Sequence, residues 1–211
     1  MAEAPTDPSH PAAFWDARYA EPGYAYGEEP NAWLVRQSER LPTEGAALVP
    51  AAGEGRDAVW LAQRGLRVTA VDLSREGLAK TGRLAASRAV EVETVHADLQ
   101  DWTWPVEGVD VVALSFVHAS PLFRAEMHRR AAGALAPGGL LVIEGFHVGQ
   151  LVYREVSGGP PRADMLFTAD LLREDFAGLE VVELEEAETV LREGIYHDGP
   201  AHVVHGVFRK A

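Results

Sequence analysis

Between residues 47 and 74 a short apolar run, a glycine-containing turn, a helical pattern and a second apolar run follow one another. The sequence there reads ALVPAAGEGRDAVWLAQRGLRVTAVDLS. This order predicts a strand, a turn, a helix and a second strand parallel to the first, because parallel strands need a crossover of about a dozen residues or more. Open sheets built from such units bind ligands beyond the carboxyl ends of their strands. We therefore expect a nucleotide-like cofactor at this turn.

Other apolar runs extend the same pattern along the chain. They lie near residues 91–95, 109–115 and 140–146, in addition to 46–50 and 67–71, and helical patterns separate them. Ser74 is expected to cap the helix after the second strand, and Ser120 with Pro121 is expected to begin a later one that ends near residues 136–139. The alternation predicts a mostly parallel sheet with helices on both faces.

The pattern changes beyond residue 178. Two strand-like segments, LEVVELEEAETV and AHVVHGVFRK, follow with no helix between them. They predict an antiparallel hairpin. A length of 211 residues favours one domain spanning 1–211, with residues 1–12 as a flexible end.

Composition excludes several classes of function. The absence of cysteine excludes disulfides and a cysteine nucleophile, and a formal net charge of −13 argues against a broad nucleic-acid surface. No apolar run reaches transmembrane length, and the start lacks the features of a secretory signal, so we expect a cytoplasmic protein without a membrane partner. His202 and His205 do not have metal-ligand spacing, and we predict no metal.

The glycine turn alone leaves two cofactors open. Gly53, Gly55 and Ala58 fit the G-x-G-x-x-G/A spacing of dinucleotide-binding proteins, with Asp72 where a ribose-binding acid is expected. However, no lysine follows a tyrosine by four residues, as short-chain dehydrogenases require, and the chain has no room for a second catalytic domain. An NAD-dependent oxidoreductase is therefore the least favoured hypothesis.

From about residue 14 onward the chain resembles class I S-adenosylmethionine-dependent methyltransferases of the tellurite-resistance and thiopurine methyltransferase group. The segments that carry the resemblance are FWDARY (14–19), YGEEPNAWL (26–34), GEGRDAVWLAQRG (53–65), VTAVDLS (68–74), HADLQDW (96–102) and LAPGGLLVIEGF (135–146). The resemblance implies an α/β, Rossmann-like fold. Its seven-stranded, mostly parallel sheet would have one antiparallel strand near the C-terminus and helices on both faces. The implied cofactor is S-adenosylmethionine.

The resemblance also implies cofactor contacts after four strand ends, at Gly53 and Gly55, Asp72 and Leu73, Asp98 and Leu99, and Ser115 and Phe116. The glycines would let the backbone approach the methionine part, Asp72 would accept from the ribose hydroxyls, and Asp98 with Leu99 would border the adenine. Each group also has an ordinary structural interpretation. The glycines can serve a tight turn, Asp98 can cap a turn or helix, and Ser115 and Phe116 can be core residues.

Two further segments are expected to close the site. Residues 13–45 would form an N-terminal cap over the cofactor, in which Arg18 reaches the cofactor carboxylate and Tyr26 closes the pocket. Residues 147–168 contain a Gly-Gly-Pro-Pro cluster and would form either a lid or a plain surface connection. Substrate contacts are expected from His118, His147, Tyr153 and Met165, although a structural role for either histidine is also open. No catalytic residue is assigned.

The predicted function is methyl transfer to a small-molecule nucleophile such as a thiol or a selenium or tellurium oxyanion. The segment LSFVHASP lacks the Asn/Asp-Pro-Pro-aromatic motif of enzymes that methylate the amino groups of DNA bases and glutamine. Val49 and Ala51 stand where relatives usually carry an acid and often a glycine. A module that binds S-adenosylmethionine but has lost catalysis is therefore the alternative. The sequence assigns neither the acceptor nor the oligomeric state.

Overall fold

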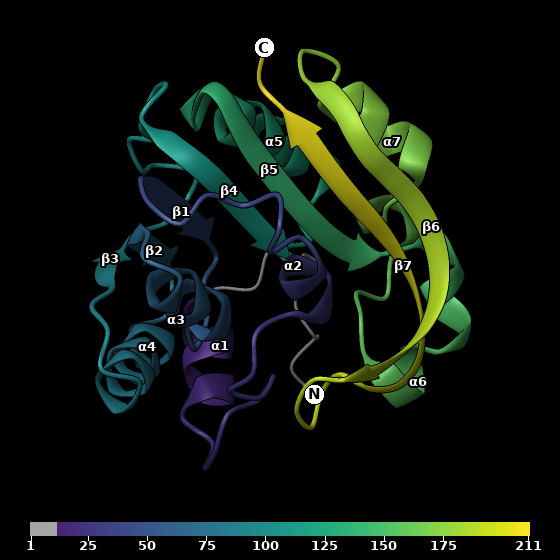
Figure 1. The fold of residues 1–211 in the computed structure, drawn as a ribbon. Coiled ribbons are helices and arrows are strands. Elements are labelled where there is room, and N and C mark those ends of the chain that lie inside the picture. Colours follow the sequence, from purple (N-terminus) through teal and green to yellow (C-terminus); the bar gives the residue numbers. More distant parts are fainter. Residues whose placement is uncertain (1–11) are drawn as a thin grey trace.

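A seven-stranded sheet forms the centre of the structure, a computed structural model that describes residues 12–211 (Figure 1). The strands lie in the order β3-β2-β1-β4-β5-β7-β6. Pairing is parallel from β3 to β5, whereas β7 is antiparallel to both of its neighbours and alone runs against the rest. The strands are β1 Ala46–Pro50, β2 Arg67–Asp72, β3 Glu93–His96, β4 Val109–Ser115, β5 Leu135–Phe146, β6 Glu180–Arg192 and β7 Asp198–Arg209. This arrangement confirms the predicted fold class.

Helices cover both faces of the sheet (Figure 1). α2, α3 and α4 lie on one face, and α5 and α7 lie on the other. The helices are α1 Ala12–Tyr19, α2 Ala32–Arg36, α3 Arg56–Gln63, α4 Arg75–Ser87, α5 Pro121–Ala134, α6 Arg154–Ser157 and α7 Ala169–Asp175, with 3₁₀ turns η1 Val148–Val152 and η2 Ala163–Met165. None of the helices in residues 12–211 is long and apolar enough to cross a membrane.

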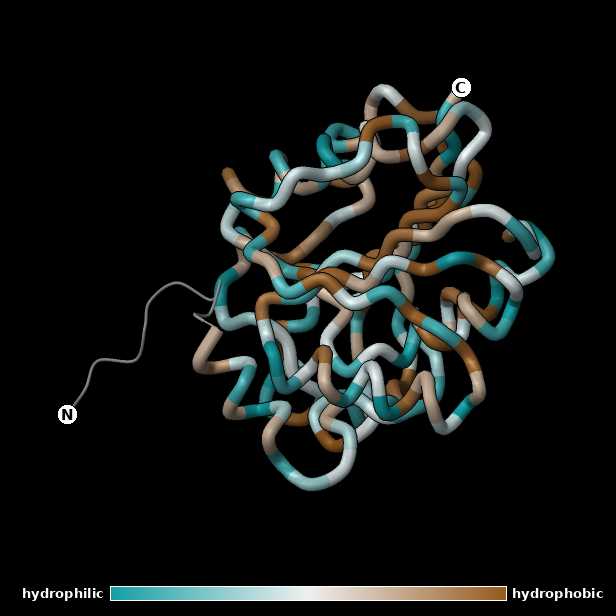
Figure 2. Tube along the Cα trace, turned by 90° about the vertical axis from the view of Figure 1, so that its left-hand side faces the viewer, coloured by the Kyte–Doolittle hydropathy of each residue, from teal (hydrophilic) through white to brown (hydrophobic). Residues whose placement is uncertain are grey.

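The side chains of the central strands point alternately to the two faces of the sheet, and this divides the core into two layers. In β1, Leu48 joins the cluster under α5 and α7, whereas Ala47 and Val49 join the cluster under α2 and α3. Side chains of successive strand residues point to opposite faces, so a strand covered on both sides must be apolar at every position. The hydrophobic stretches accordingly run through the middle of the molecule (Figure 2).

Local signals set most of the element boundaries. The Ser74 hydroxyl accepts from Gly77 N at 3.0 Å and caps α4, as predicted. Pro121 begins α5 as predicted, but the Ser120 side chain makes no capping hydrogen bond. α5 ends at Ala134, and β5 starts at Leu135 rather than at the expected residue 140, because Leu135 already pairs with Val109 of β4.

The predicted hairpin is confirmed by β6 and β7, which pair continuously from Glu180–Arg209 to Arg192–Asp198 apart from one bulge. The segment 193–197 that joins them reaches the N-terminal segment, where Tyr196 N donates to Ala25 O at 3.4 Å. The expected flexible end, residues 1–12, lies outside the described residues except for Ala12, which begins α1.

Candidate active site

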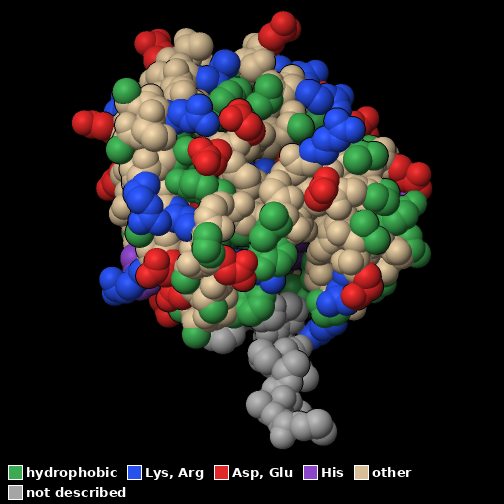
Figure 3. Space-filling model, turned by 90° about the horizontal axis from the view of Figure 1, so that it is seen from below, with side chains coloured by type: hydrophobic (Ala, Val, Ile, Leu, Met, Phe, Trp, Pro, Cys, Tyr) green, Lys and Arg blue, Asp and Glu red, His purple; other side chains and the backbone are tan. Residues whose placement is uncertain are grey.

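A cavity of about 1150 Å³ lies beyond the carboxyl ends of β1, β2, β3, β4 and β5. The turns that follow these strands form one part of its wall. α1, the segment around Tyr26 and residues 159–162 form another part. The lower face of the molecule carries Lys and Arg side chains interspersed with Asp and Glu (Figure 3). Open α/β sheets bind their ligands at this position, beyond the carboxyl ends of the strands.

The turn between β1 and α3 depends on two glycines with positive φ. Gly53 has φ +56° and Gly55 has φ +88°, conformations that side chains with a Cβ rarely adopt. A Cβ on Gly55 would lie 2.5 Å from Thr81 Cγ2, and one on Gly53 would lie 2.8 Å from Tyr19 Oη. Both glycines therefore have a packing role. Gly53 also lines the cavity, whereas Gly55, which was predicted to contact the cofactor, does not.

Asp72, at the end of β2, is buried and holds the glycine turn in place. Its Oδ2 accepts from Gly53 N at 2.7 Å, and its Oδ1 accepts from Ser74 N at 2.7 Å. Burial raises the pKa of Asp72, while these backbone hydrogen bonds oppose the rise. Each carboxylate oxygen has a second lone pair, so the side chain can accept further hydrogen bonds from a ligand hydroxyl. Leu73 follows it along the cavity wall.

The ends of β3 and β4 bring the other predicted cofactor residues to the same cavity. Asp98 accepts from Gln100 N at 2.9 Å, which is a turn-forming contact, and Leu99 is buried beside it. Phe116 has a positive φ of 56°, and its N donates to Glu144 O at 2.7 Å. Asp98, Leu99, Ser115 and Phe116 all line the cavity.

Arg18 and Tyr26 meet on the cavity wall formed by the N-terminal segment. Arg18 Nη1 donates to Tyr26 Oη at 2.9 Å, and the guanidinium lies 3.9 Å from the ring centroid of Tyr196. Burial raises the pKa of Tyr26, although Arg18 opposes the rise. Within residues 12–211 no carboxylate bonds to Arg18, so its charge is available to an anionic group in the cavity.

His118 and Met165 line the cavity, but both nitrogens of His118 are occupied. Nε2 accepts from Phe146 N at 2.9 Å, and Nδ1 lies 2.8 Å from Met165 O, to which it donates in that tautomer. Burial lowers the pKa of His118 to about 4. These contacts give the ring a structural role between β5 and η2.

The structure places His147 and Tyr153 outside the cavity. His147 Nδ1 accepts from Gly149 N at 3.0 Å and lies 3.2 Å from His202 Nδ1. The chain turns away from the site here because His147 forms a parallel bridge with Phe167. No group of three His, Cys, Asp or Glu within the described residues could hold a metal ion.

The segment expected to be a lid contributes only its middle to the cavity, at residues 159–162, Arg154 and Met165. The rest is fixed to β7. Gln150 Oε1 accepts from His202 N at 2.9 Å, and the Ser157 hydroxyl donates to Pro200 O at 2.6 Å.

Two buried acids in the cavity wall were missed by the sequence analysis. Glu54 accepts from Ala25 N and from Lys80 Nζ, both at 2.7 Å, and Asp57 accepts from Asn31 N at 2.7 Å. Val49 is buried among apolar side chains in the core beside them. Acidic groups are thus present in the cavity although β1 lacks one. The position of these two acids within the segment GEGRDA was the only sequence signal that could have identified them.

Phe146 and His197 were also missed. Phe146 ends β5, and its ring lies 4.7 Å from that of Phe116. The His197 ring lies 4.5 Å from Phe116 and 4.6 Å from Tyr26. Both residues line the cavity. His197 comes from the hairpin connection, where no local pattern indicates a site.

Comparisons with known proteins bear on the chemistry of this cavity. A family model described as a methyltransferase domain matches residues 48–139. A thiopurine S-methyltransferase from Pseudomonas putida (strain GB-1) is 29% identical over 201 residues, covering 84% of this chain and 88% of that protein.

Solved structures share the fold. A structure from work on the conversion of a disulfide bond into a thioacetal group during echinomycin biosynthesis has a TM-score of 0.72 at 23% identity, covering 95% of this chain and 92% of that one. TehB from Haemophilus influenzae has a TM-score of 0.69 at 15% identity, covering 86% and 62%. The Burkholderia thailandensis 1,6-didemethyltoxoflavin-N1-methyltransferase, with bound S-adenosylhomocysteine, has a TM-score of 0.60 at 22% identity, covering 85% and 79%.

Proposed function

Because the chain is a class I S-adenosylmethionine-dependent methyltransferase, we propose that it methylates a small molecule at a soft nucleophile, and that this nucleophile is a thiol. The size of the cavity carries the proposal. Its volume of about 1150 Å³ exceeds the roughly 300–1,000 Å³ of a typical ligand pocket. A cofactor and a small acceptor would therefore fit together. The thiopurine S-methyltransferase among the relatives methylates sulfur, as its name states, and this supports the choice of a thiol.

We assign the cofactor to the part of the cavity beside β1, β2 and β3. The turn at Gly53 would admit the methionine portion close to the backbone, because glycine has no side chain. Asp72, with Leu73 beside it, would bind the ribose through its free lone pairs. Asp98 and Leu99 would border the adenine.

The closing wall would bind the charged end of the cofactor. Arg18 would contact its carboxylate, since the guanidinium has no acidic partner among residues 12–211. Tyr26 would close the pocket over it, and Ser115 with Phe116 would line the floor. Glu54, in the turn after β1, and Asp57, in the first turn of α3, are the cavity-lining acids that could attract the ammonium group.

The acceptor would occupy the apolar end, which Phe116, Phe146 and Met165 line. The bound cofactor supplies an electrophilic methyl sulfonium. The protein would exclude water and hold the acceptor in line with the methyl group, and such alignment lowers the barrier by several kcal/mol. Aromatic and thioether groups suit a polarisable sulfur better than a hydrated amine.

The test is a product assay with purified protein and S-adenosylmethionine. The acceptor panel would contain aromatic and alkyl thiols, selenite, tellurite and small amines, and mass spectrometry would detect S-adenosylhomocysteine with the methylated product. We expect methylated thiols. Cofactor binding by calorimetry without transfer to any acceptor would contradict the proposal and favour the binding-module alternative. Transfer to selenite, tellurite or an amine but to no thiol would correct the acceptor class.

A further inference from the structure

A histidine of the β6–β7 connection, His197, lines the cavity, and Glu193 of the same connection lies behind it. Glu193 follows the end of β6, and His197 precedes the start of β7. Glu193 N donates to His197 O at 2.8 Å, which closes this tight connection. Both side chains are buried, with exposures of 9% and 6%.

Glu193 is held by groups from two other elements. Its Oε1 accepts from Asn31 Nδ2 at 3.3 Å and from Ala32 N at 3.4 Å, and its Oε2 accepts from Arg56 Nη2 at 2.8 Å. Burial opposes its ionisation, but His197 and Arg56 hold the pKa of Glu193 to about 2. The carboxylate is therefore charged at neutral pH and fixed in place.

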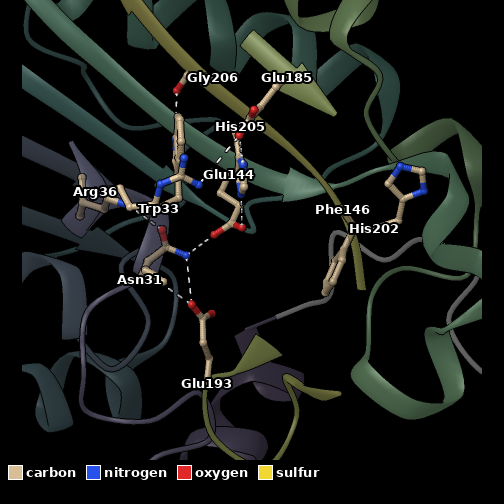
Figure 4. Close-up of polar contacts among 12 residues, drawn as sticks. Asn31, Trp33, Arg36, Glu144, Phe146, Glu185, Glu193, His202, His205 and Gly206 are labelled. Atoms are coloured by element: carbon tan, nitrogen blue, oxygen red, sulfur yellow. Dashed lines mark hydrogen bonds and ion pairs between the residues drawn. The ribbon is translucent and has the colours of Figure 1, made fainter. Parts of the chain in front are cut away.

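A second layer of contacts fixes Asn31 in turn (Figure 4). Asn31 Nδ2 also donates to Glu144 Oε2, and Glu144 Oε1 lies 2.9 Å from His205 Nε2. The His205 ring stacks on Trp33 at 4.3 Å between centroids. Buried networks in which the members have partners rigidify a site, so Glu193 is pre-organised by residues distant in the sequence.

Packing sets the orientation of the His197 ring, and neither ring nitrogen makes a hydrogen bond within the described residues. Phe116, Phe146 and Tyr26 surround it. Its Nδ1 is buried and lies 3.8 Å from Glu193 Oε2, too far for a hydrogen bond. Its Nε2 bonds to no group in the part of the chain that the structure describes, and the residue lines the cavity.

We propose that His197 is the catalytic proton acceptor for the methyl acceptor, with Glu193 as its positioning residue; this inference rests on the proposed thiol methyltransferase function. The negative charge of Glu193 beside Nδ1 favours the tautomer in which Nδ1 carries the proton and Nε2 is free. As the acceptor sulfur forms its bond to the methyl carbon, the carbon–sulfonium bond breaks. The S–H proton passes to His197 Nε2 and then to water after product release.

The charged and titratable groups around His197 are consistent with this role. Burial lowers the pKa of His197, whereas Glu193 raises it and Arg56 lowers it, with a net decrease. The ring is therefore neutral at pH 7 and can accept a proton. Glu144 raises the pKa from further away, and His118 is a neutral neighbour. His118 is not an alternative base, because both of its nitrogens are occupied.

The test compares thiols of different acidity. An alkyl thiol is largely protonated at pH 7, whereas a nitro-substituted aromatic thiol is already ionised and needs no base. His197→Gln should lower kcat/KM for the alkyl thiol roughly 100-fold and for the ionised thiol less than about threefold. Glu193→Gln should show the same selectivity with a smaller loss. His202→Gln, on β7 outside the cavity, is the matched control and should resemble the wild type with both thiols.

The possible outcomes separate the two proposals. Equal losses for both thiols would overturn the proton-acceptor role and leave thiol methylation standing. A wild-type enzyme that methylates no thiol would overturn the proposed function and this inference with it. Calorimetry with S-adenosylmethionine would establish that each variant still folds and binds.

The tautomer of His197 in the wild-type protein provides a second test, which does not depend on enzymatic activity. Long-range ¹⁵N–¹H NMR of the histidine rings at pH 7 should show His197 with a protonated Nδ1 and an unprotonated Nε2. Glu193→Gln should shift the ring toward the other tautomer. A wild-type His197 that is protonated at Nε2 would contradict the proposal even if the substituted proteins failed to fold.

Discussion

Single carboxylates in this protein combine structural and proposed binding roles. Asp72 fixes the β1–α3 turn through Gly53 N and Ser74 N. Asp110 does similar work at the opposite end of the sheet, where its Oδ2 accepts from Ala46 N at 2.8 Å. Replacing either should leave a backbone donor without its partner and cost about 1–3 kcal/mol of stability. Only Asp72 lines the cavity.

Asp72→Ala should therefore weaken S-adenosylmethionine binding at least tenfold, as expected when about 1.4 kcal/mol of ribose contact is lost. Asp110→Ala should lose stability without losing affinity. Calorimetry on the two folded variants measures the difference. Equal affinity in both would remove Asp72 from the cofactor site.

Ala51 is strained because its φ is +51°, a conformation that costs a residue with a Cβ about 1–2 kcal/mol. Ala51→Gly should raise the unfolding free energy by about 0.5–1 kcal/mol, since the greater flexibility of unfolded glycine offsets part of the relief. Ala125→Gly, on the exposed side of α5, is the control and should lower stability by a similar amount. Urea denaturation of both variants tests this; a loss of stability in Ala51→Gly would show that the turn is not strained.

His118 makes stability depend on pH. Its folded pKa of about 4 is below the unfolded value of about 6.5, so the unfolded chain takes up the proton first. The stability that the buried, neutral His118 ring contributes is fully present above pH 6.5 and is lost as the pH falls toward 4. The loss of stability amounts to about 3 kcal/mol at 1.36 kcal/mol per pKa unit.

His118→Asn should flatten this acid-side decline in melting temperature. His128 and His197 also have pKa values lowered by burial and act in the same direction, so some decline should remain. His205 acts in the opposite direction, because Glu144 and Glu185 raise its pKa despite burial. Parallel curves for His118→Asn and the wild type between pH 6.5 and 4 would contradict the assignment.

At the scale of elements, the segment between β5 and α7 is anchored near both of its ends. Gln150 bonds to β7 and to Gly158 O, and Phe167 pairs with His147. Gly158 and Gly159 have positive φ values, which suit a local bend. We propose that only residues around 158–162 move as a lid.

Limited trypsin digestion at the half-exposed Arg162 tests this proposal. Cleavage should slow several-fold when S-adenosylhomocysteine and a thiol are both present, because closure removes the chain from the protease. Gln150→Ala should speed cleavage by releasing the anchor. Equal cleavage rates in every ligand state would instead indicate a passive connection.

At the scale of the whole molecule, buried contacts tie the N-terminal segment to the sheet and to the hairpin. Lys80 Nζ donates to Glu21 O and to Glu54 Oε1, and Asn31 bonds to both Glu144 and Glu193. A cap that shares its polar partners with the core cannot separate without leaving charges unpaired. We therefore propose that residues 12–211 unfold as one domain.

Thermal unfolding should accordingly show one transition. The transitions followed by far-UV circular dichroism and by tryptophan fluorescence, to which Trp15 and Trp33 of the N-terminal segment contribute, should coincide. S-adenosylmethionine at 100 times its Kd should add about 2.7 kcal/mol, a rise of about 5–10 °C for a chain of this size. A separate early fluorescence transition would show that the cap is an independent unit.

The sequence by itself determined the parts of this protein that have local physical signals. Apolar runs marked β1, β2 and β4, the Ser74 cap marked α4, and the glycines marked the turn over which the predicted cofactor residues converge. Each signal depends on a few neighbouring residues. Periodicity, φ angles and caps are local properties of the chain.

Only the tertiary structure decided the acceptor end of the cavity. His197 meets Phe116 and Tyr26 across long stretches of chain, and Glu193 meets Asn31 in the same way. The sequence analysis assigned substrate contacts to this end without finding His197. Contacts between distant residues produce no regular spacing in the sequence. They arise only when the hairpin folds back across the carboxyl ends of the sheet.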